Sequence, residues 1–355
     1  MQIETIFTAK PKDKPDFKNL GFGKYFSDHM FIMKYTEGRG WHDAKIVPYA
    51  PIPLDPSALV LHYGQETFEG LKAYKDKEEK ITLFRPRDNF RRMNKSNDRM
   101  CMPQIDVEAA LNALKKLLLA ESGWIPTEPD TSLYIRPFII ATEPSLGVKV
   151  SKEYLFVIIL SPVGSYYPEG LKPTSIYVEE YYIRSAEGGT GDAKISGNYA
   201  ASLKPYENAK RQGFSQVLFL DGKEKKYIEE VGTSNAFFVI NGELYTTPLS
   251  SGTILPGITR DSVIQIAKDK GLKVNEKALS IEDVFSSAEE GHLDECFASG
   301  TAAVVSPIGS LTYRGKTISI AGGNIGEITQ DLYNTLTGIQ YGRLEDKFGW
   351  VEAVN

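Results

Sequence analysis

The chain is poor in the residues from which disulfide frameworks and metal sites are built. Its two cysteines, Cys101 and Cys296, lie far apart in a chain of 355 residues and form no CxxC pair, so a disulfide-stapled fold is excluded. None of the four histidines belongs to an HExxH motif. We therefore expect no catalytic zinc and no other metal.

Positive charge and long apolar runs are also scarce. The 41 lysines and arginines face 46 aspartates and glutamates, and the formal net charge of -5 argues against nucleic acid as the main partner. No apolar run approaches the roughly 20 residues that span a bilayer, and Met1 to Lys18 lacks the apolar stretch of a signal peptide. We therefore expect a cytoplasmic protein that does not bind a membrane.

The remaining composition is that of a folded protein with more than one core. Hydrophobic residues make up 41% and charged residues 25% of the chain, which are ordinary values for a globular protein. A length of 355 residues exceeds the usual size of a single core, so two domains are expected.

Residue patterns predict an α+β fold that mixes strands and helices. Runs rich in β-branched and aromatic residues predict strands at 30–35, 81–84, 132–141, 154–160, 175–182, 216–220 and 236–240. Apolar residues at helical spacing predict helices at 106–122, 258–270, 281–290 and 325–344. Asn241-Gly242 predicts a tight turn.

A segment rich in proline and glycine separates two parts of the chain. Ser161 to Pro173 contains three prolines and two glycines, which interrupt regular structure. We therefore expect an N-terminal domain at 1–161, an interdomain loop at 162–174 and a C-terminal domain at 175–355.

Lys194 is surrounded by glycines, at positions 188, 189, 191 and 197. Glycines let the backbone approach a bound group closely, so this lysine is a candidate for chemistry. A phosphate-binding P-loop would need glycine before the lysine and Ser or Thr after it, whereas the neighbours are Ala193 and Ile195. The other functional interpretation is a lysine that carries a carbonyl cofactor as an imine, and the bland alternative is a solvated loop lysine.

Other segments could serve such a cofactor, although spacing does not choose among them. Glu229 and Glu230 could supply a carboxylate to a pyridine nitrogen, but two adjacent glutamates are more often a solvated edge. Residues 255–260 open a predicted helix and could bind a phosphate, as could the small-residue turn at 299–303. Several arginines between Arg85 and Arg99 could add a charge-assisted bond.

Taken together, these motifs resemble those of the branched-chain amino acid aminotransferases, which are homodimeric pyridoxal-phosphate enzymes of fold type IV. The resemblance covers nearly the whole chain, and its specificity comes from eight motifs in the same order. They are residues 25–30 (YFSDHM), 61–73 (LHY through FEGLKA), 132–137 (SLYIRP), 143–147 (EPSLG), the Lys194 segment, 230–233 (EVGT), 254–257 (ILPG) and 299–302 (SGTA).

The resemblance implies a smaller N-terminal α/β domain, a larger C-terminal pseudo-barrel and a pyridoxal 5'-phosphate site. Lys194 would carry the cofactor as an imine and move a proton during catalysis. Tyr199 would bind the phenolic oxygen of the cofactor and Glu230 its pyridine nitrogen. The phosphate would be bound by Arg92, Ile258, Thr259 and Thr301.

The resemblance also implies the substrates and the residues that bind them. The reaction would be ping-pong amino transfer between L-leucine, L-isoleucine or L-valine and 2-oxoglutarate. Tyr63 and the turn at Thr301-Ala302 would lie near the α-carboxylate, and Thr233 would also bind substrate. Arg136 would meet the γ-carboxylate of glutamate or 2-oxoglutarate. The side-chain pocket would be walled by Phe26, Phe68, Tyr134 and Tyr166, some of them from the partner subunit.

Alternatives remain within and outside this family. D-amino acid transaminase and aminodeoxychorismate lyase share the lysine and the carboxylate, and the run at 68–72 favours the branched-chain enzyme over both. A non-catalytic phosphate-binding module is the distant alternative. Ala303 and Ser306 stand where some eukaryotic members carry a CxxC redox pair, so thiol regulation is not expected there. One methylene discriminates weakly in an apolar pocket, so the sequence does not rank leucine, isoleucine and valine.

Overall fold

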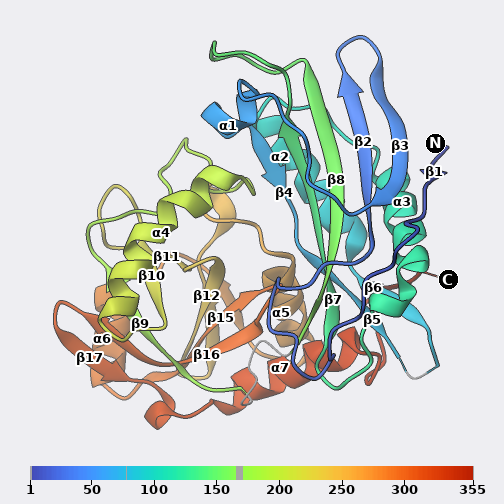
Figure 1. Cartoon of the computed structure of the whole chain (residues 1–355). Coiled ribbons are helices and arrows are strands. Elements are labelled where there is room, and N and C mark those ends of the chain that lie inside the picture. The colour runs from blue at the N-terminus through green and yellow to red at the C-terminus, as the bar shows by residue number, and fades with distance from the viewer. Residues whose placement is uncertain (1, 77, 165–170, 355) are drawn as a thin grey trace. The chain divides into compact units, whose positions relative to one another are not determined.

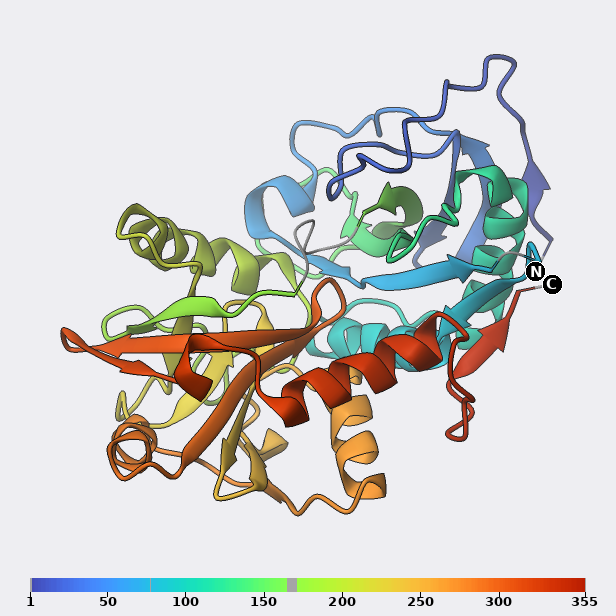
Figure 2. The same cartoon turned by 90° about the horizontal axis from the view of Figure 1, so that it is seen from below.

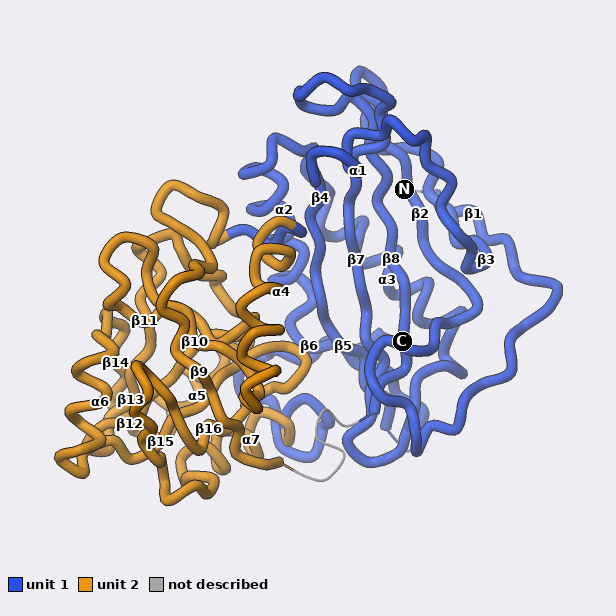
Figure 3. The backbone as a smooth tube through the Cα atoms, turned by 60° about the vertical axis from the view of Figure 1, so that its left-hand side comes forward, with its two compact units in different colours: residues 1–166, 193–196, 339–355 blue, residues 167–192, 197–338 orange. Residues whose placement is uncertain are grey.

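The computed structural model describes residues 2–76, 78–164 and 171–354, and it divides into two compact units (Figure 3). Unit 1 comprises residues 1–166, 193–196 and 339–355, and unit 2 comprises residues 167–192 and 197–338. Because the last 17 residues of the chain pack with unit 1, the two units are similar in size.

Unit 1 is built on a nine-stranded mixed sheet (Figure 1). Its strand order is β1-β3-β2-β8-β7-β5-β6-β18, and β4 also pairs with β7. The strands are β1 (Glu4–Thr5), β2 (His29–Thr36), β3 (Gly40–Pro48), β4 (Glu66–Phe68), β5 (Leu71–Lys75), β6 (Ile81–Phe84), β7 (Ser132–Ala141), β8 (Glu153–Val163) and β18 (Val351–Ala353).

The long strands β7 and β8 form the centre of this sheet, and both are predicted from their apolar composition. They pair along their length, from Ser132 with Val163 to Ala141 with Tyr154. Strand β8 extends to Val163, two residues into the segment expected to be a loop. Pro162 is tolerated there because the pairing of β8 with β2 ends at Ile158, so its missing N–H removes no ladder bond on that side.

Helices α1 (Leu59–Tyr63), α2 (Pro86–Arg99) and α3 (Val107–Ala120) belong to unit 1. The predicted helix at 106–122 is confirmed as α3, and the side chain of Asp106 caps its start by accepting a hydrogen bond from the Ala109 amide. The α3 leucines that recur at helical spacing are buried in the core of unit 1: Leu111, Leu114, Leu117 and Leu118. Helix α2 was not predicted, because its residues are mostly basic and polar. One face of the helix is nevertheless buried.

The C-terminal strand β18 is the last strand of the unit 1 sheet (Figure 2). It pairs antiparallel with β6, with Val351 opposite Phe84. This pairing joins residues that are more than 250 positions apart, so no local pattern in the sequence predicts it.

Unit 2 contains a sheet that closes on itself, as the expected pseudo-barrel requires. Its order is β11-β10-β9-β16-β15-β12-β13-β14, and an additional pairing of β11 with β12 closes a six-stranded ring. The strands are β9 (Thr174–Glu179), β10 (Gln216–Leu220), β11 (Ile228–Val231), β12 (Ser234–Ile240), β13 (Glu243–Thr246), β14 (Val274–Glu276), β15 (Leu293–Gly300), β16 (Val304–Tyr313) and β17 (Lys316–Ser319).

The rest of the described chain also contains the helices α4 (Ser196–Arg211), α5 (Ile258–Asp269), α6 (Ile281–Glu289) and α7 (Glu327–Gln340). The last three confirm the predicted helices at 258–270, 281–290 and 325–344. Helix α6 packs Ile281, Val284 and Phe285 into one core of unit 2. Helix α4 was not predicted, and Pro205 lies within it. Among the described residues, no helix is long and apolar enough to cross a membrane.

Candidate active site

Lys194 lies in the short segment 193–196 that packs with unit 1. Its backbone amide donates to Ser96 Oγ at 2.9 Å, and its carbonyl accepts from the Phe68 amide at 3.1 Å. Ser96 is a buried residue of α2, and Phe68 ends β4. The main chain of the lysine is therefore fixed on two sides, which gives its side chain a stationary base.

The Lys194 amine lies beside side chains that were predicted to bind substrate. Its Nζ atom is 4.8 Å from the centroid of the Phe68 ring. The Arg136 guanidinium lies 4.9 Å from the same ring and donates through Nη2 to the Tyr134 hydroxyl at 2.8 Å. Gly70 leaves room for this side chain, because a Cβ atom at that position would overlap the Tyr134 hydroxyl unless the tyrosine shifted. Unit 1 thus brings together Lys194, Phe68, Tyr134 and Arg136.

Arg92, predicted to bind phosphate, pairs with a fully buried glutamate. Its Nε and Nη2 atoms donate to the two oxygens of Glu69 at 2.7 and 2.8 Å, and Asn89 adds a third bond to that carboxylate at 2.8 Å. Burial alone would raise the pKa of Glu69, but the charge and hydrogen bonds of Arg92, with nearby Lys194, lower it below its ordinary value. Glu69 belongs to the motif at 61–73, but nothing in the sequence alone assigns it this role.

The other substrate residues predicted in the N-terminal part have other contacts, or fall outside the described residues. The Phe26 ring stacks on Tyr49 at 5.1 Å between centroids. Tyr63 ends α1, is 40% exposed and donates from its hydroxyl to the Leu146 carbonyl. Tyr166 falls in the segment 165–170, which lies outside the described residues.

Glu230, in unit 2, is held by two residues that the sequence did not single out. It is 1% exposed, and Arg184 forms an ion pair with it through Nε. Nη1 of Arg184 donates to the carbonyls of Gly191 and Thr253, at 3.1 and 3.0 Å. Asn235 donates to Glu230 Oε1 at 2.9 Å. Only the fold brings these segments of unit 2 together, so no spacing in the sequence could have revealed the group.

The interpretation of Glu229 and Glu230 as a solvated edge is wrong, because both are buried in β11. Glu229 is 3% exposed, and its Oε2 atom has no hydrogen-bond partner among the described residues. It also lines a cavity of about 300 Å³. Burial, reinforced by the charges of Glu230 and Asp221, raises the pKa of Glu229 to about 7.

The start of α5 offers backbone amides to an anion. Gly257 is the N-cap residue, and no side chain caps the helix. The amides of Ile258 and Thr259 follow directly, where the helix dipole favours negative charge. Asn235 fixes the preceding loop through the Leu255 carbonyl at 2.9 Å, so the same side chain contacts this loop and Glu230.

The remaining predicted residues of unit 2 lie at turns and on a helix. Thr301 and Ala302 lie in the turn that connects β15 to β16. Val304, the first residue of β16, has a φ of 62°, which is a strained conformation for a β-branched residue. Thr233 is an exposed residue between β11 and β12, and Tyr199 is a half-buried residue of α4. Their roles remain predictions.

Comparison with known proteins places these features in a family. Residues 66–311 match the model of class IV amino-transferases. The chain is 54% identical over 354 residues to branched-chain-amino-acid aminotransferase 2 of Bacillus subtilis, covering 100% of this chain and 97% of that protein.

Solved structures show the same fold. The branched-chain amino acid aminotransferase of Escherichia coli matches with a TM-score of 0.75 and 28% identity, covering 92% of this chain and 99% of that one. The branched-chain amino acid aminotransferase of Thermobaculum terrenum, solved in its PLP-form, matches with a TM-score of 0.73 and 25% identity. That match covers 92% of this chain and 98% of the other.

Proposed function

The chain belongs to the class IV amino-transferase family, and we propose that it is a branched-chain-amino-acid aminotransferase. It moves an amino group reversibly between L-leucine, L-isoleucine or L-valine and 2-oxoglutarate, giving branched 2-oxo acids and L-glutamate. The observation that carries this proposal is the group of Lys194, Phe68, Tyr134 and Arg136. An enzyme that accepts both leucine and glutamate needs ring surface for an aliphatic side chain and a guanidinium for a carboxylate.

Pyridoxal 5'-phosphate fits the groups that the chain provides. Lys194 offers an amine for an imine bond, Glu230 a buried carboxylate for the pyridine nitrogen, and the uncapped start of α5 the amides of Ile258 and Thr259 for the phosphate. When bound, this cofactor draws electrons from Cα of the amino acid and so weakens the Cα–H bond. Tyr199 is assigned to the phenolic oxygen, and Arg92 and Thr301 to the phosphate.

The chain's own residues orient these groups and move the proton. Lys194 would be the group that accepts the Cα proton of the amino acid and gives it back during the transfer, and its fixed main chain lets the amine move about a stationary Cα. Arg184 and Asn235 hold the Glu230 carboxylate in one orientation. Glu69 holds Arg92 in the same way, through two parallel bonds.

Substrate binding is divided between aromatic and polar residues. We assign the side-chain pocket to Phe26, Phe68, Tyr134 and Tyr166, because branched aliphatic chains are selected by burial against apolar surface. Arg136 receives the γ-carboxylate of glutamate or 2-oxoglutarate. The α-carboxylate is assigned to Tyr63, Thr233 and Ala302.

We propose a homodimer with a shared active site, acting in the cytoplasm, with domains at 1–161 and 175–355 joined by residues 162–174. Support for the dimer comes from an apolar edge of unit 1, formed by Leu61, Tyr63, Leu146, Val148 and Val150, which are 40 to 83% exposed. Exposed apolar side chains on two neighbouring segments are a feature that protein interfaces often have.

The absorption spectrum of the purified protein tests the cofactor and its lysine together. We expect a visible band that borohydride abolishes, and we expect Lys194→Ala to lose both the band and nearly all turnover. A colourless active protein, or an active Lys194→Ala variant, would refute the assignment. A non-catalytic phosphate-binding module would show neither band nor turnover.

Coupled turnover with 2-oxoglutarate separates the rivals within the family. L-Leucine should be the preferred donor, since the Phe68 ring lies beside the Lys194 amine and the Tyr134 ring beside the Arg136 guanidinium. Preference for D-alanine would instead indicate a D-amino acid transaminase, and release of pyruvate from aminodeoxychorismate would indicate the lyase.

A further inference from the structure

Phe26 is assigned to the wall of the substrate pocket, yet it lies outside the sheet of unit 1, three residues before β2 begins. Its half-buried ring stacks on Tyr49 with an interplanar angle of 13°. A residue outside regular secondary structure needs other contacts to hold its ring in one place.

Lys12, from the N-terminal segment, provides such contacts on two sides of Phe26. Its ammonium donates to the Phe26 carbonyl at 3.2 Å and to the Ser27 carbonyl at 2.8 Å. The same atom lies 4.4 Å from the centroid of the Tyr49 ring, on which Phe26 stacks. One cation therefore fixes both the main chain of Phe26 and the aromatic ring that supports it.

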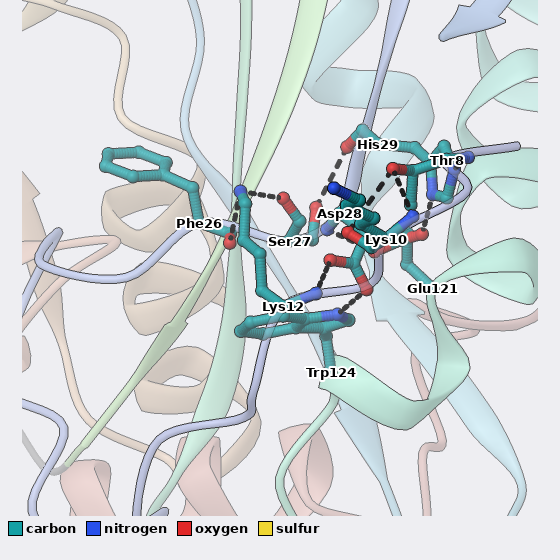
Figure 4. Close-up of polar contacts among 9 residues, drawn as sticks. All are labelled: Thr8, Lys10, Lys12, Phe26, Ser27, Asp28, His29, Glu121 and Trp124. Carbon is teal, nitrogen blue, oxygen red and sulfur yellow. Dashed lines mark hydrogen bonds and ion pairs between the residues drawn. The ribbon is translucent and has the colours of Figure 1, made fainter. Parts of the chain in front are cut away.

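The main chain of Lys12 is itself anchored, so the ammonium is not at the end of a loose segment (Figure 4). The Lys12 amide donates to Asp28 Oδ1 at 2.8 Å. The other oxygen of Asp28 accepts from the Trp124 indole at 2.9 Å, and the Asp28 amide donates to Glu121 Oε2 at 2.8 Å. These bonds connect the N-terminal segment to the chain just after α3.

His29 adds a second anchor four residues earlier in the segment. The Thr8 amide donates to His29 Nε2 at 2.8 Å, so Nε2 is the accepting nitrogen, and Nδ1 carries the proton. Nδ1 in turn donates to Glu121 Oε1 at 2.5 Å. His29 is 5% and Glu121 2% exposed, so this connection is buried.

The charge on Lys12 is balanced by nearby carboxylates. Burial lowers the pKa of the Lys12 amine, and the charges of Asp28 and Glu121 oppose that change. The two carboxylates lie in the network that fixes the lysine backbone, so one acidic pair both anchors the segment and stabilises the cation.

From these contacts we propose that Lys12 is a positioning residue for the Phe26 wall, and that residues 8–12 act as a strap that tunes the pocket for aliphatic side chains. The inference rests on the proposed function, because it takes Phe26 as part of the substrate pocket. Leucine depends on ring surface for its binding, whereas glutamate also has the Arg136 guanidinium. Loosening Phe26 should therefore weaken leucine binding more than glutamate binding.

The kinetic test compares Lys12→Met with Lys14→Met in the holoenzyme. Lys14 comes from the same segment but lies 6.0 Å over the Trp124 ring, so it is a matched control for the loss of one charge. We expect Lys12→Met to raise KM for L-leucine about fivefold, with kcat and KM for L-glutamate changed less than twofold. Lys12→Arg, which keeps the charge and its donors, should restore KM for leucine. Equal kinetics in the two methionine variants, or an equal rise in both KM values, would overturn the proposal.

Hydrogen exchange of the backbone tests the strap without reference to activity. The peptide covering residues 24–31 should exchange faster in Lys12→Met than in wild type or Lys14→Met. Unchanged exchange would overturn the positioning role. If the wild type did not turn over L-leucine, the proposed function would fail, while the exchange result would still decide whether Lys12 holds this segment.

Discussion

Two carboxylates of this chain, those of Glu69 and Glu230, are buried. Each forms an ion pair with an arginine and accepts a hydrogen bond from an asparagine. Asn89 completes the first group and Asn235 the second. A buried charge is tolerated only where its hydrogen bonds are made. Asn235 donates to the Glu230 oxygen that Arg184 does not contact, and Asn89 adds a further bond to a Glu69 oxygen that Arg92 also contacts. The two groups hold Arg92 and Glu230, the residues assigned to the ends of the cofactor, in fixed orientations.

Glu69→Gln should destabilise unit 1 strongly. It removes the charge that compensates buried Arg92, and breaking a buried pair from one side costs about 3 kcal/mol. Urea denaturation followed by circular dichroism measures the loss. Asp88→Asn is the control, because Asp88 pairs with Arg85 and Arg91 near the surface and should cost less than about 1 kcal/mol. Equal losses in the two variants would contradict this account of Glu69.

Glu229 should make the free energy of unfolding fall as the pH rises from about 4.5 to about 7. The folded protein keeps the Glu229 proton up to a pKa of about 7, whereas the unfolded chain releases it near 4.5. Between these values the folded state binds more protons, so stability that is complete below pH 4.5 is lost towards pH 7, by roughly 3 kcal/mol.

Comparison of Glu229→Gln with wild type isolates this contribution. Glutamine mimics the protonated acid and should flatten the pH dependence between 4.5 and 7. Glu224→Gln changes an exposed carboxyl at the same cavity and should leave the slope as in wild type. A wild-type slope in Glu229→Gln would show that this acid does not retain its proton on folding.

At the scale of elements, the glycines around Lys194 have a structural use as well as the chemical one inferred from the sequence. A Cβ atom on Gly191 would overlap the Thr253 carbonyl oxygen, to which Arg184 donates. Gly188 has a φ of 75°, in the left-handed region that glycine adopts without strain. These glycines therefore let the segment before Lys194 pack closely against the loop that precedes α5.

Gly191→Ala should disturb this packing in unit 2. The added methyl group must displace the Thr253 backbone and with it an anchor of Arg184, at a cost of about 1 to 3 kcal/mol. We also expect weaker cofactor binding, measured by the visible band during dialysis. Gly147→Ala, where the nearest atom to the new Cβ is Ser145 Oγ at 3.8 Å, should change neither property. Retention of wild-type stability in Gly191→Ala would show that the backbone tolerates the contact.

At the scale of the whole molecule, the apolar edge of unit 1 has a defined framework. The Leu59 amide donates to the Glu143 carbonyl, and the Ser145 amide donates to the Ser57 carbonyl, so α1 and the loop at 143–150 lie side by side. The exposed residues of the edge come from these two segments. A framework fixed by main-chain bonds can present apolar side chains to a partner at little conformational cost.

Val148→Glu should weaken the proposed dimer. Val148 is 83% exposed, so the substitution costs little within one chain, whereas a charge buried in an interface is strongly unfavourable. Sedimentation equilibrium should show a dimer for wild type and a shift towards monomer for Val148→Glu. Leu119→Glu, at a 48% exposed position on α3, is the control and should remain dimeric. A dimer unaffected by Val148→Glu would place the interface elsewhere.

The sequence alone determined the periodic elements and the family, and it singled out Lys194 as the candidate reactive lysine. The predicted strands at 81–84, 132–141 and 216–220 have the observed bounds, and α3, α5, α6 and α7 lie within a few residues of prediction. Their periodicity reflects which faces are buried, a property that each segment carries by itself. The eight ordered motifs are likewise short stretches that can be read from the sequence, and the comparisons confirm the family that they indicated.

Only the tertiary structure decided which groups lie against one another. Glu69 with Arg92, Arg184 with Glu230, and Lys12 with Phe26 are pairs whose members are 14 to 46 positions apart, and each is set by packing between different elements. The burial of Glu229 and Glu230 contradicted the local expectation for the same reason. Hydrophobic periodicity indicates which face of a single element is buried. The partner of a buried charge, in contrast, depends on which neighbouring element packs against that charge and excludes water from it.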